Sequence, residues 1–194
     1  MGLAAQKSLN VYAVAEAEAY FRKALATYER DPSCAEPLPA ARAVVGLLET
    51  LMLKSDYRDA GNVAERFMPV VMQAGETPEL VAAYYYRTLS LVQRYHLRAA
   101  YALITEAAGV AERLCDSRAR AYARAGLLHC RTRLGLDTFE GAERRKAEVM
   151  ADCLSFDDNF LRNSAYFFVT WDYLYRGLVK DARAIAVRLT ASGR

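Results

Sequence analysis

Apolar residues recur along this chain every three to four positions, which is the spacing of amphipathic helices, and no stretch keeps the strict alternation of a strand. Capping and helix-breaking residues separate the apolar segments, for example Asp56, Thr77-Pro78, Asp116 and Gly135. Asp137, with Glu140 three residues on, resembles a capping box for the helix that follows. The connections are short, so consecutive helices should be antiparallel neighbours. The pattern predicts an all-α domain over 1–194, with an unpaired or partial repeat over 1–31 and helix pairs over 39–75, 77–114, 116–153 and 157–192.

A set of marker alanines repeats through these segments. Ala60, Ala100, Ala142 and Ala182 are spaced by 40, 42 and 40 residues, and Ala17 gives an earlier copy 43 residues before Ala60. Self-similarity at such a period is typical of helical repeats, in which each unit buries its apolar face against the next. Alanine is expected where two helices cross too closely for a larger side chain. We therefore expect the marker alanines to be buried at equivalent helix crossings.

The residues around the markers resemble the second helix of a tetratricopeptide repeat (TPR). The copies read Val14-Ala17-Phe21-Ala24, Tyr57-Ala60-Ala64-Phe67, Leu97-Ala100-Ile104-Ala107, Phe139-Ala142-Lys146-Val149 and Val179-Ala182-Ala186-Leu189. The chain departs from the family in its period of 40–43 rather than about 34 residues, and in Lys146, which stands where an apolar residue is expected. The resemblance implies a right-handed solenoid of antiparallel helix pairs. Longer repeats of this kind are similar to sensor arms of bacterial signalling ATPases, maltose-regulon-type activators and class III nucleotide cyclases.

Composition excludes several classes of protein. The chain has 194 residues, of which 54% are apolar and 25% charged, as in a globular domain. A net charge of +3 is too small and too dispersed to favour nucleic-acid binding. No apolar run is long enough to span a membrane, and Glu16 and Glu18 interrupt any secretory signal, so we expect a cytoplasmic protein. The four cysteines form no Cys-x-x-Cys pair, so we expect reduced thiols and neither a zinc site nor a disulfide framework.

Catalytic motifs are absent from the sequence. It contains no Gly-rich phosphate loop, no G-x-S-x-G elbow and no H-E-x-x-H pair. The adjacent His129 and Cys130 would point to different faces of one helix, which disfavours a Cys–His nucleophile. We therefore expect a protein that is not an enzyme and needs no cofactor or metal.

Candidate ligand-binding residues lie on the first helices of the pairs, which the TPR resemblance places on the concave surface. They are Tyr85, Arg120, Arg124, Arg131, Phe167 and Trp171. The three arginines share one side of a helix beside an apolar stripe, and could bind a carboxylate or phosphate. The alternative is a solvated helix edge whose arginines pair with Glu112, Asp116 or Glu140. The segment 158–176 is rich in aromatic rings, most of them expected in the core and some against a partner.

These features predict a noncatalytic interaction or sensory module that binds a protein or peptide, preferably acidic and aromatic, in its concave groove. One alternative is the regulatory region of a larger signalling enzyme, such as a nucleotide cyclase or ATPase, and another is a small-molecule or RNA-binding solenoid. The unpaired first helix and the uncapped end at 192–194 favour a segment of a longer protein. Terminal repeats with exposed apolar faces should then support self-association through the terminal helices.

Overall fold

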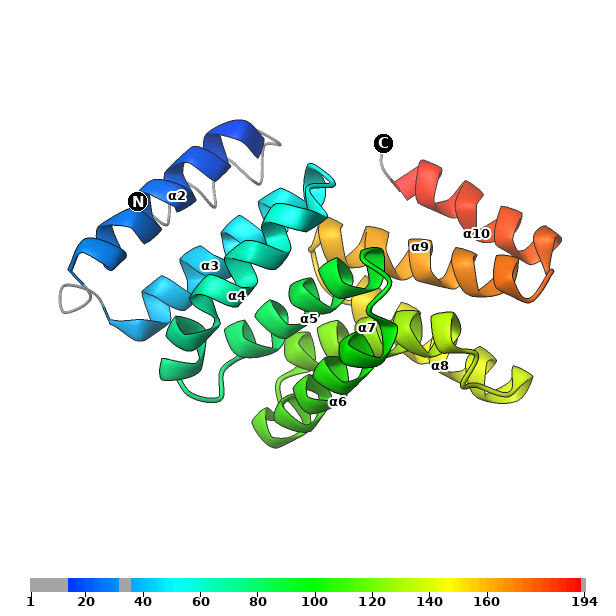
Figure 1. The fold of residues 1–194 in the computed structure, drawn as a ribbon. Helices are drawn as coiled ribbons and strands as arrows, with labels where there is room; N and C mark the ends of the chain where they lie inside the picture. Colours follow the sequence, from blue (N-terminus) through cyan, green and yellow to red (C-terminus); the bar gives the residue numbers. More distant parts are fainter. Residues whose placement is uncertain (1–13, 32–35, 193–194) are drawn as a thin grey trace. The chain divides into compact units, whose positions relative to one another are not determined.

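The computed structural model describes residues 14–31 and 36–192, and these residues form helices and short connections without a strand (Figure 1). The prediction of an all-α fold is confirmed for these ranges, while the part of the first helix predicted before residue 14 lies outside them. The helices are α2 (Val14–Arg30), α3 (Pro37–Leu53), α4 (Tyr57–Gln73), α5 (Pro78–Gln93), α6 (Leu97–Leu114), α7 (Ser117–Leu134), α8 (Phe139–Leu154), α9 (Asn159–Tyr175) and α10 (Val179–Ser192).

Local sequence signals set most of the helix ends. The side chains of Asp56, Thr77 and Asp116 accept hydrogen bonds from backbone amides three residues on, at 3.1, 3.3 and 2.7 Å. Each of these bonds satisfies an amide that has no partner inside its helix. Gly135, with a φ of 64°, ends α7 in the left-handed conformation that glycine adopts without steric cost. These four predicted helix ends are confirmed.

The predicted capping box of Asp137 and Glu140 is wrong. Thr138 is the N-cap of α8, and its hydroxyl accepts a hydrogen bond from the Gly141 amide at 3.2 Å. The Asp137 carboxylate is engaged instead by the guanidinium groups of Arg131 and Arg145. A charge-assisted pairing with two arginines is stronger than a single cap bond, so the neighbouring threonine takes the capping position.

The connections repeat as regularly as the helices. Left-handed backbone conformations occur every 20 residues between α3 and α8, at Ser55, Gly75, Tyr95, Cys115 and Gly135. Every marker alanine is the fourth residue of its helix. A helix with its connection therefore spans about 20 residues and a helix pair about 40, which explains the period seen in the sequence.

The chain divides into two compact units, Met1–His96 and Leu97–Arg194. In the first unit, α3 packs against α2, α4 and α5, and in the second, α7 packs against α6, α8 and α9 while α10 packs against α9. The boundary falls inside the predicted pair 77–114, and a single domain over 1–194 stays a prediction.

The marker alanines are all buried, as predicted: Ala17, Ala60, Ala100, Ala142 and Ala182.

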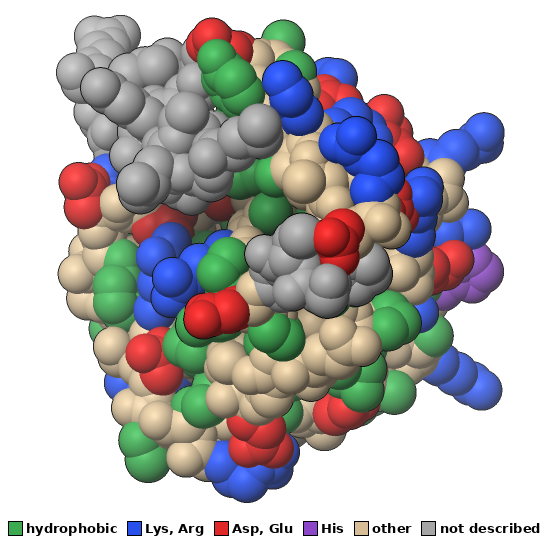
Figure 2. Space-filling model, turned by 90° about the vertical axis from the view of Figure 1, so that its left-hand side faces the viewer, with side chains coloured by type: hydrophobic (Ala, Val, Ile, Leu, Met, Phe, Trp, Pro, Cys, Tyr) green, Lys and Arg blue, Asp and Glu red, His purple; other side chains and the backbone are tan. Residues whose placement is uncertain are grey.

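The surface drawn in Figure 2 carries basic, acidic and hydrophobic side chains interspersed over the same area, without a large field of one charge. In the described residues, no helix is long and apolar enough to cross a bilayer.

Candidate functional site

A row of exposed large apolar side chains runs along α9 in the second unit. Phe167, Trp171, Leu174 and Tyr175 have exposed fractions of 43, 38, 42 and 53%. Their spacing of four, seven and eight residues from Phe167 places them on one side of a helix. We call these four residues the α9 stripe. Because exposed large apolar side chains usually occur singly, a contiguous set of four on one helix face indicates a binding surface.

The rings of the stripe contact one another in sequence. The ring centroids of Phe167 and Trp171 lie 5.9 Å apart, and those of Trp171 and Tyr175 lie 5.5 Å apart. The Arg133 guanidinium of α7 lies 5.9 Å from the Tyr175 ring centroid, within the range of a cation–π contact. The stripe is therefore a preformed row of rings with a cation at its C-terminal end.

The other rings of α9 are mostly core, as the sequence predicted. Tyr166 and Phe168 are buried, and Tyr173 is half-buried. The Phe168 ring stacks on His129 of α7, with centroids 4.3 Å apart. The helix therefore uses aromatic residues for two purposes, packing against α7 on one side and forming an exposed surface on another.

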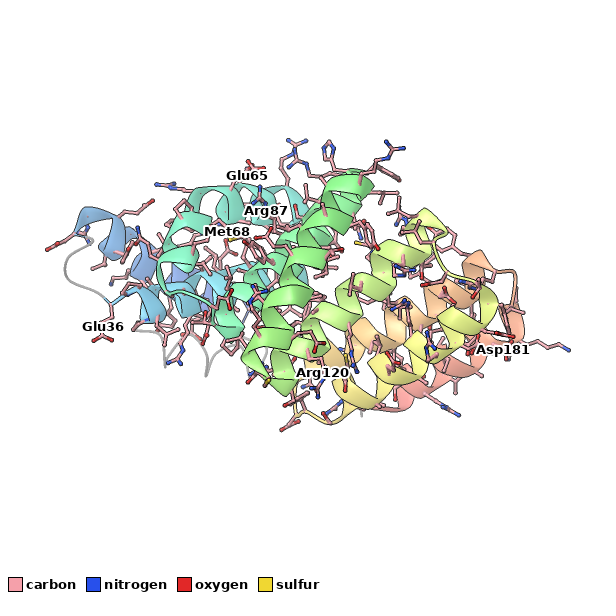
Figure 3. The ribbon with its side chains drawn as sticks, turned by 90° about the horizontal axis from the view of Figure 1, so that it is seen from below. Glu36, Glu65, Met68, Arg87, Arg120 and Asp181 are labelled. Atoms are coloured by element: carbon pink, nitrogen blue, oxygen red, sulfur yellow. The ribbon has the colours of Figure 1, made fainter. Side chains whose placement is uncertain are left out.

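The predicted arginine row is divided between two internal partners. Arg124 and Arg120 both approach Asp152 of α8, at 2.8 and 3.9 Å, and both guanidinium side chains stay partly exposed. Figure 3 shows Arg120 near the N-terminal end of α7. Asp152 is not among the acidic residues expected from the sequence as partners. Arg120 and Arg124 can still reach a ligand, because their ion pairs lie at the surface.

Arg131 is held inside the unit. Its guanidinium donates to the Asp137 carboxylate at 2.8 Å, to the Tyr101 hydroxyl at 2.9 Å and to the Leu136 carbonyl at 3.4 Å. Burial raises the pKa of Asp137, but the hydrogen bonds from Arg131 and Arg145 outweigh it and leave that pKa below its usual value. Arg131 thus ties α6 and the α7–α8 connection to α7, and we do not assign it to ligand binding.

Tyr85, the remaining candidate, lies in α5 of the first unit and is fully buried. A side chain with no exposed area offers a ligand no contact, so its role is core packing. The structure thus brings Phe167 and Trp171 together on one surface and places Arg120 and Arg124 beside the same carboxylate, that of Asp152. Arg131 makes contacts within the unit, and Tyr85 lies in the core.

Comparison with known proteins identifies the fold. No family model and no curated protein matches this chain. Two similar crystal structures contain nearly identical TPR-like repeats of a Podosopora anserina protein assigned as a kinesin light chain. One, a variant, has a TM-score of 0.62 and 15% identity over 98% of this chain and 91% of that one. The other has a TM-score of 0.61 and 13% identity, over 98% of this chain and 92% of that chain. This chain has a TPR-like repeat fold. The all-α solenoid predicted from the marker alanines is confirmed.

Lys146, the departure from the TPR pattern, marks a buried charge cluster that the sequence did not predict. Its side chain is 3% exposed and its ammonium lies 2.9 Å from the carboxylate of Asp172, which is 1% exposed. Asp172 also accepts hydrogen bonds from Thr132 at 2.9 Å and from Arg176 at 3.0 Å. A charged residue at a position that is apolar in the other copies was the available signal. Its partner lies on the next helix, 26 positions later, and could not be inferred.

Glu143 and Tyr173 complete this cluster. The Lys146 ammonium lies 2.6 Å from Glu143 and 3.4 Å from the centroid of the Tyr173 ring. The Tyr173 hydroxyl donates to Glu143 at 3.2 Å, and burial raises the pKa of that hydroxyl above its usual value. Each buried charge thus has an opposite charge and further polar contacts, which buried ion pairs require. The cluster joins α8 to α9 and is structural.

The His129–Cys130 pair is not activated for chemistry. Burial, with a contribution from Arg133, lowers the pKa of His129 to about 3, and burial raises the pKa of the Cys130 thiol to about 12. A cysteine nucleophile must be a thiolate, and this thiol is protonated at neutral pH. In residues 14–31 and 36–192, no group of three or more histidine, cysteine, aspartate or glutamate side chains could hold a metal ion.

Proposed function

We propose that the second unit is a noncatalytic protein-interaction module that binds a peptide segment on the α9 stripe. The observation that carries the proposal is the row of exposed rings at Phe167, Trp171 and Tyr175. Aromatic side chains supply large contact areas at low entropic cost, and they are the residues in which binding energy concentrates at interfaces. The TPR resemblance supports the same assignment, since Phe167 and Trp171 stand 15 and 11 residues before Ala182, at positions that line the concave surface of such repeats.

The preferred partner in this proposal is an acidic segment with aromatic or large apolar side chains. Arg133 adjoins the Tyr175 end of the stripe, and Arg120 and Arg124 lie partly exposed on α7, the helix that packs against α9. A partner carboxylate could join the Asp152 ion pairs without leaving a buried charge unpaired. Such surface contacts contribute mainly to specificity and association rate, while the rings supply the affinity.

Replacing Phe167 with glutamate tests this proposal. We expect the variant to bind fluorescein-labelled 12-residue peptides containing two aromatic and four acidic residues at least tenfold more weakly than the unaltered chain, measured by fluorescence anisotropy. The loss follows because the substitution removes the ring at the N-terminal end of the stripe and places a negative charge where an acidic peptide must dock.

Leu154→Glu is the matched control, because Leu154 is an exposed apolar residue of similar exposure at the end of α8 in the same unit. It should change the affinity less than twofold. Circular dichroism should show both variants folded. Equal affinities of the Phe167→Glu variant and the unaltered chain would exclude the stripe as the binding surface.

The similarity to arms of signalling ATPases, maltose-regulon-type activators and nucleotide cyclases, and the cytoplasmic location, stay predictions from the sequence. The proposed binding surface lies wholly within the second unit and does not depend on either of them.

A further inference from the structure

The helices that begin with a marker alanine motif, α2, α4, α6, α8 and α10, use one recurring face, which we call the forward face. It is formed by the residues one and four positions after the marker alanine. In the first unit this face contacts the helix that follows. A Cβ added to Gly46 of α3 would lie 2.2 Å from the Phe21 ring of α2, and one added to Gly61 of α4 would lie 2.7 Å from the Ser90 hydroxyl of α5.

The same face makes the interhelical contacts of the second unit. Tyr101 of α6 accepts a hydrogen bond from Arg131 of α7 at 2.9 Å. Glu143 and Lys146 of α8 contact Tyr173 and Asp172 of α9 at 3.2 and 2.9 Å. In all four cases the forward face of one helix is therefore covered by the next helix in the chain.

The forward face of α10 is open by comparison. The residue four positions after the marker is buried in α4, α6 and α8, but Ala186 of α10 is only half-buried, and so is Leu189 three positions further on. Arg183, one position after the marker, is exposed. Val179 and Val187, four residues before and after Arg183, are 64 and 59% exposed. This face of α10 is thus a row of two apolar residues with a cation between them.

The charges of α10 indicate what would cover this face. Arg183 lies on the forward face and Lys180, three residues before it, lies beside it, whereas Arg188 is on a different side of the helix. Asp181 lies near the start of α10 (Figure 3), two positions from Arg183 and therefore on a different side of the helix. A second copy of α10 would bring like charges together, whereas an acidic helix would pair with them.

We propose that α10 binds an acidic amphipathic helix of a partner protein on its forward face, in the position that α9 occupies on α8. The partner helix presents apolar residues to Val179, Ala186 and Val187, and a carboxylate to Arg183. This site is separate from the α9 stripe and does not rest on the peptide-binding function proposed above.

The test uses an 18-residue helical peptide with alanine and leucine on one face and glutamate on the other, together with the same peptide in which lysine replaces glutamate. Fluorescence anisotropy should show the acidic peptide binding at least tenfold more tightly than the basic one. Arg183→Glu should weaken binding of the acidic peptide about tenfold and strengthen binding of the basic peptide, because the charge at the centre of the face is reversed.

Arg188→Glu makes the same change of charge five residues along the helix, on a different side of α10, and should alter either affinity less than twofold. Phe167→Glu should also leave this binding unchanged. Equal losses in the Arg183 and Arg188 variants would attribute binding to net charge and overturn the proposal. Sedimentation that reveals a dimer dissociated by Arg183→Glu would place a second copy on α10 and overturn it as well.

Discussion

Replacing Asp172 with alanine is expected to lower the free energy of unfolding by about 3–5 kcal/mol, the range for removing one member of a buried ion pair. The carboxylate is almost fully buried and faces Lys146, Thr132 and Arg176. Without it, the ammonium of Lys146 retains the Tyr173 ring and Glu143, whose side chain is 38% exposed. Denaturation in urea, followed by circular dichroism, measures the effect.

Lys146→Met should lower the free energy of unfolding by at most about half as much as Asp172→Ala. In this variant Asp172 retains Arg176 and Thr132, and the methionine restores an apolar residue at this TPR position. The double variant Lys146→Met with Asp172→Leu should be more stable than Asp172→Ala alone, since it leaves no lysine charge uncompensated. If Lys146→Met were as destabilising as Asp172→Ala, the pair would not have the asymmetry that its contacts imply.

Acid should destabilise the second unit through His129. Its folded pKa of about 3 lies below the usual value of 6.5, so the folded state favours the neutral ring. The folded state is therefore at its most stable, with respect to His129, above pH 6.5. This stability is lost as the pH falls from 6.5 towards 3, because the unfolded chain takes up the proton first. Linkage gives a loss of about 2 kcal/mol between pH 7 and pH 5.

His129→Phe isolates this contribution, since phenylalanine can keep the stacking on Phe168 and does not titrate. Unfolding free energies of the variant should vary by about 2 kcal/mol less than those of the unaltered chain between pH 7 and pH 5. Parallel pH profiles for the two proteins would show that His129 is not held neutral by burial.

The repeat architecture could be predicted from the sequence because it depends on a small residue at a fixed place in each helix. A small residue such as Ala60 or Ala100 is required at each close helix crossing, so the spacing of the alanines in the sequence equals the spacing of the crossings. Capping residues such as Asp56 and Thr77 act within three residues of their own position, and they were also predictable.

The candidate site was less predictable because the contacts of its side chains are made with residues that are distant in sequence. Arg131 and Asp137 were assigned to a ligand and to a helix cap, yet they bind each other. Phe167 and Trp171 were predicted from their distance to Ala182, but Leu174 and Tyr175 were not. Their exposure depends on where α7 packs, so the full stripe became recognisable only once the surface of α9 was known.

The most direct test of the proposed binding surface is the indole N–H signal of Trp171 in a two-dimensional ¹⁵N NMR spectrum. The chain has a single tryptophan, so the signal needs no assignment, and its ring lies between Phe167 and Tyr175. Addition of an acidic, aromatic peptide should shift this signal in a saturable manner, and Phe167→Glu should abolish the shift. A peptide that binds by anisotropy without moving the indole signal would contradict a binding surface centred on α9.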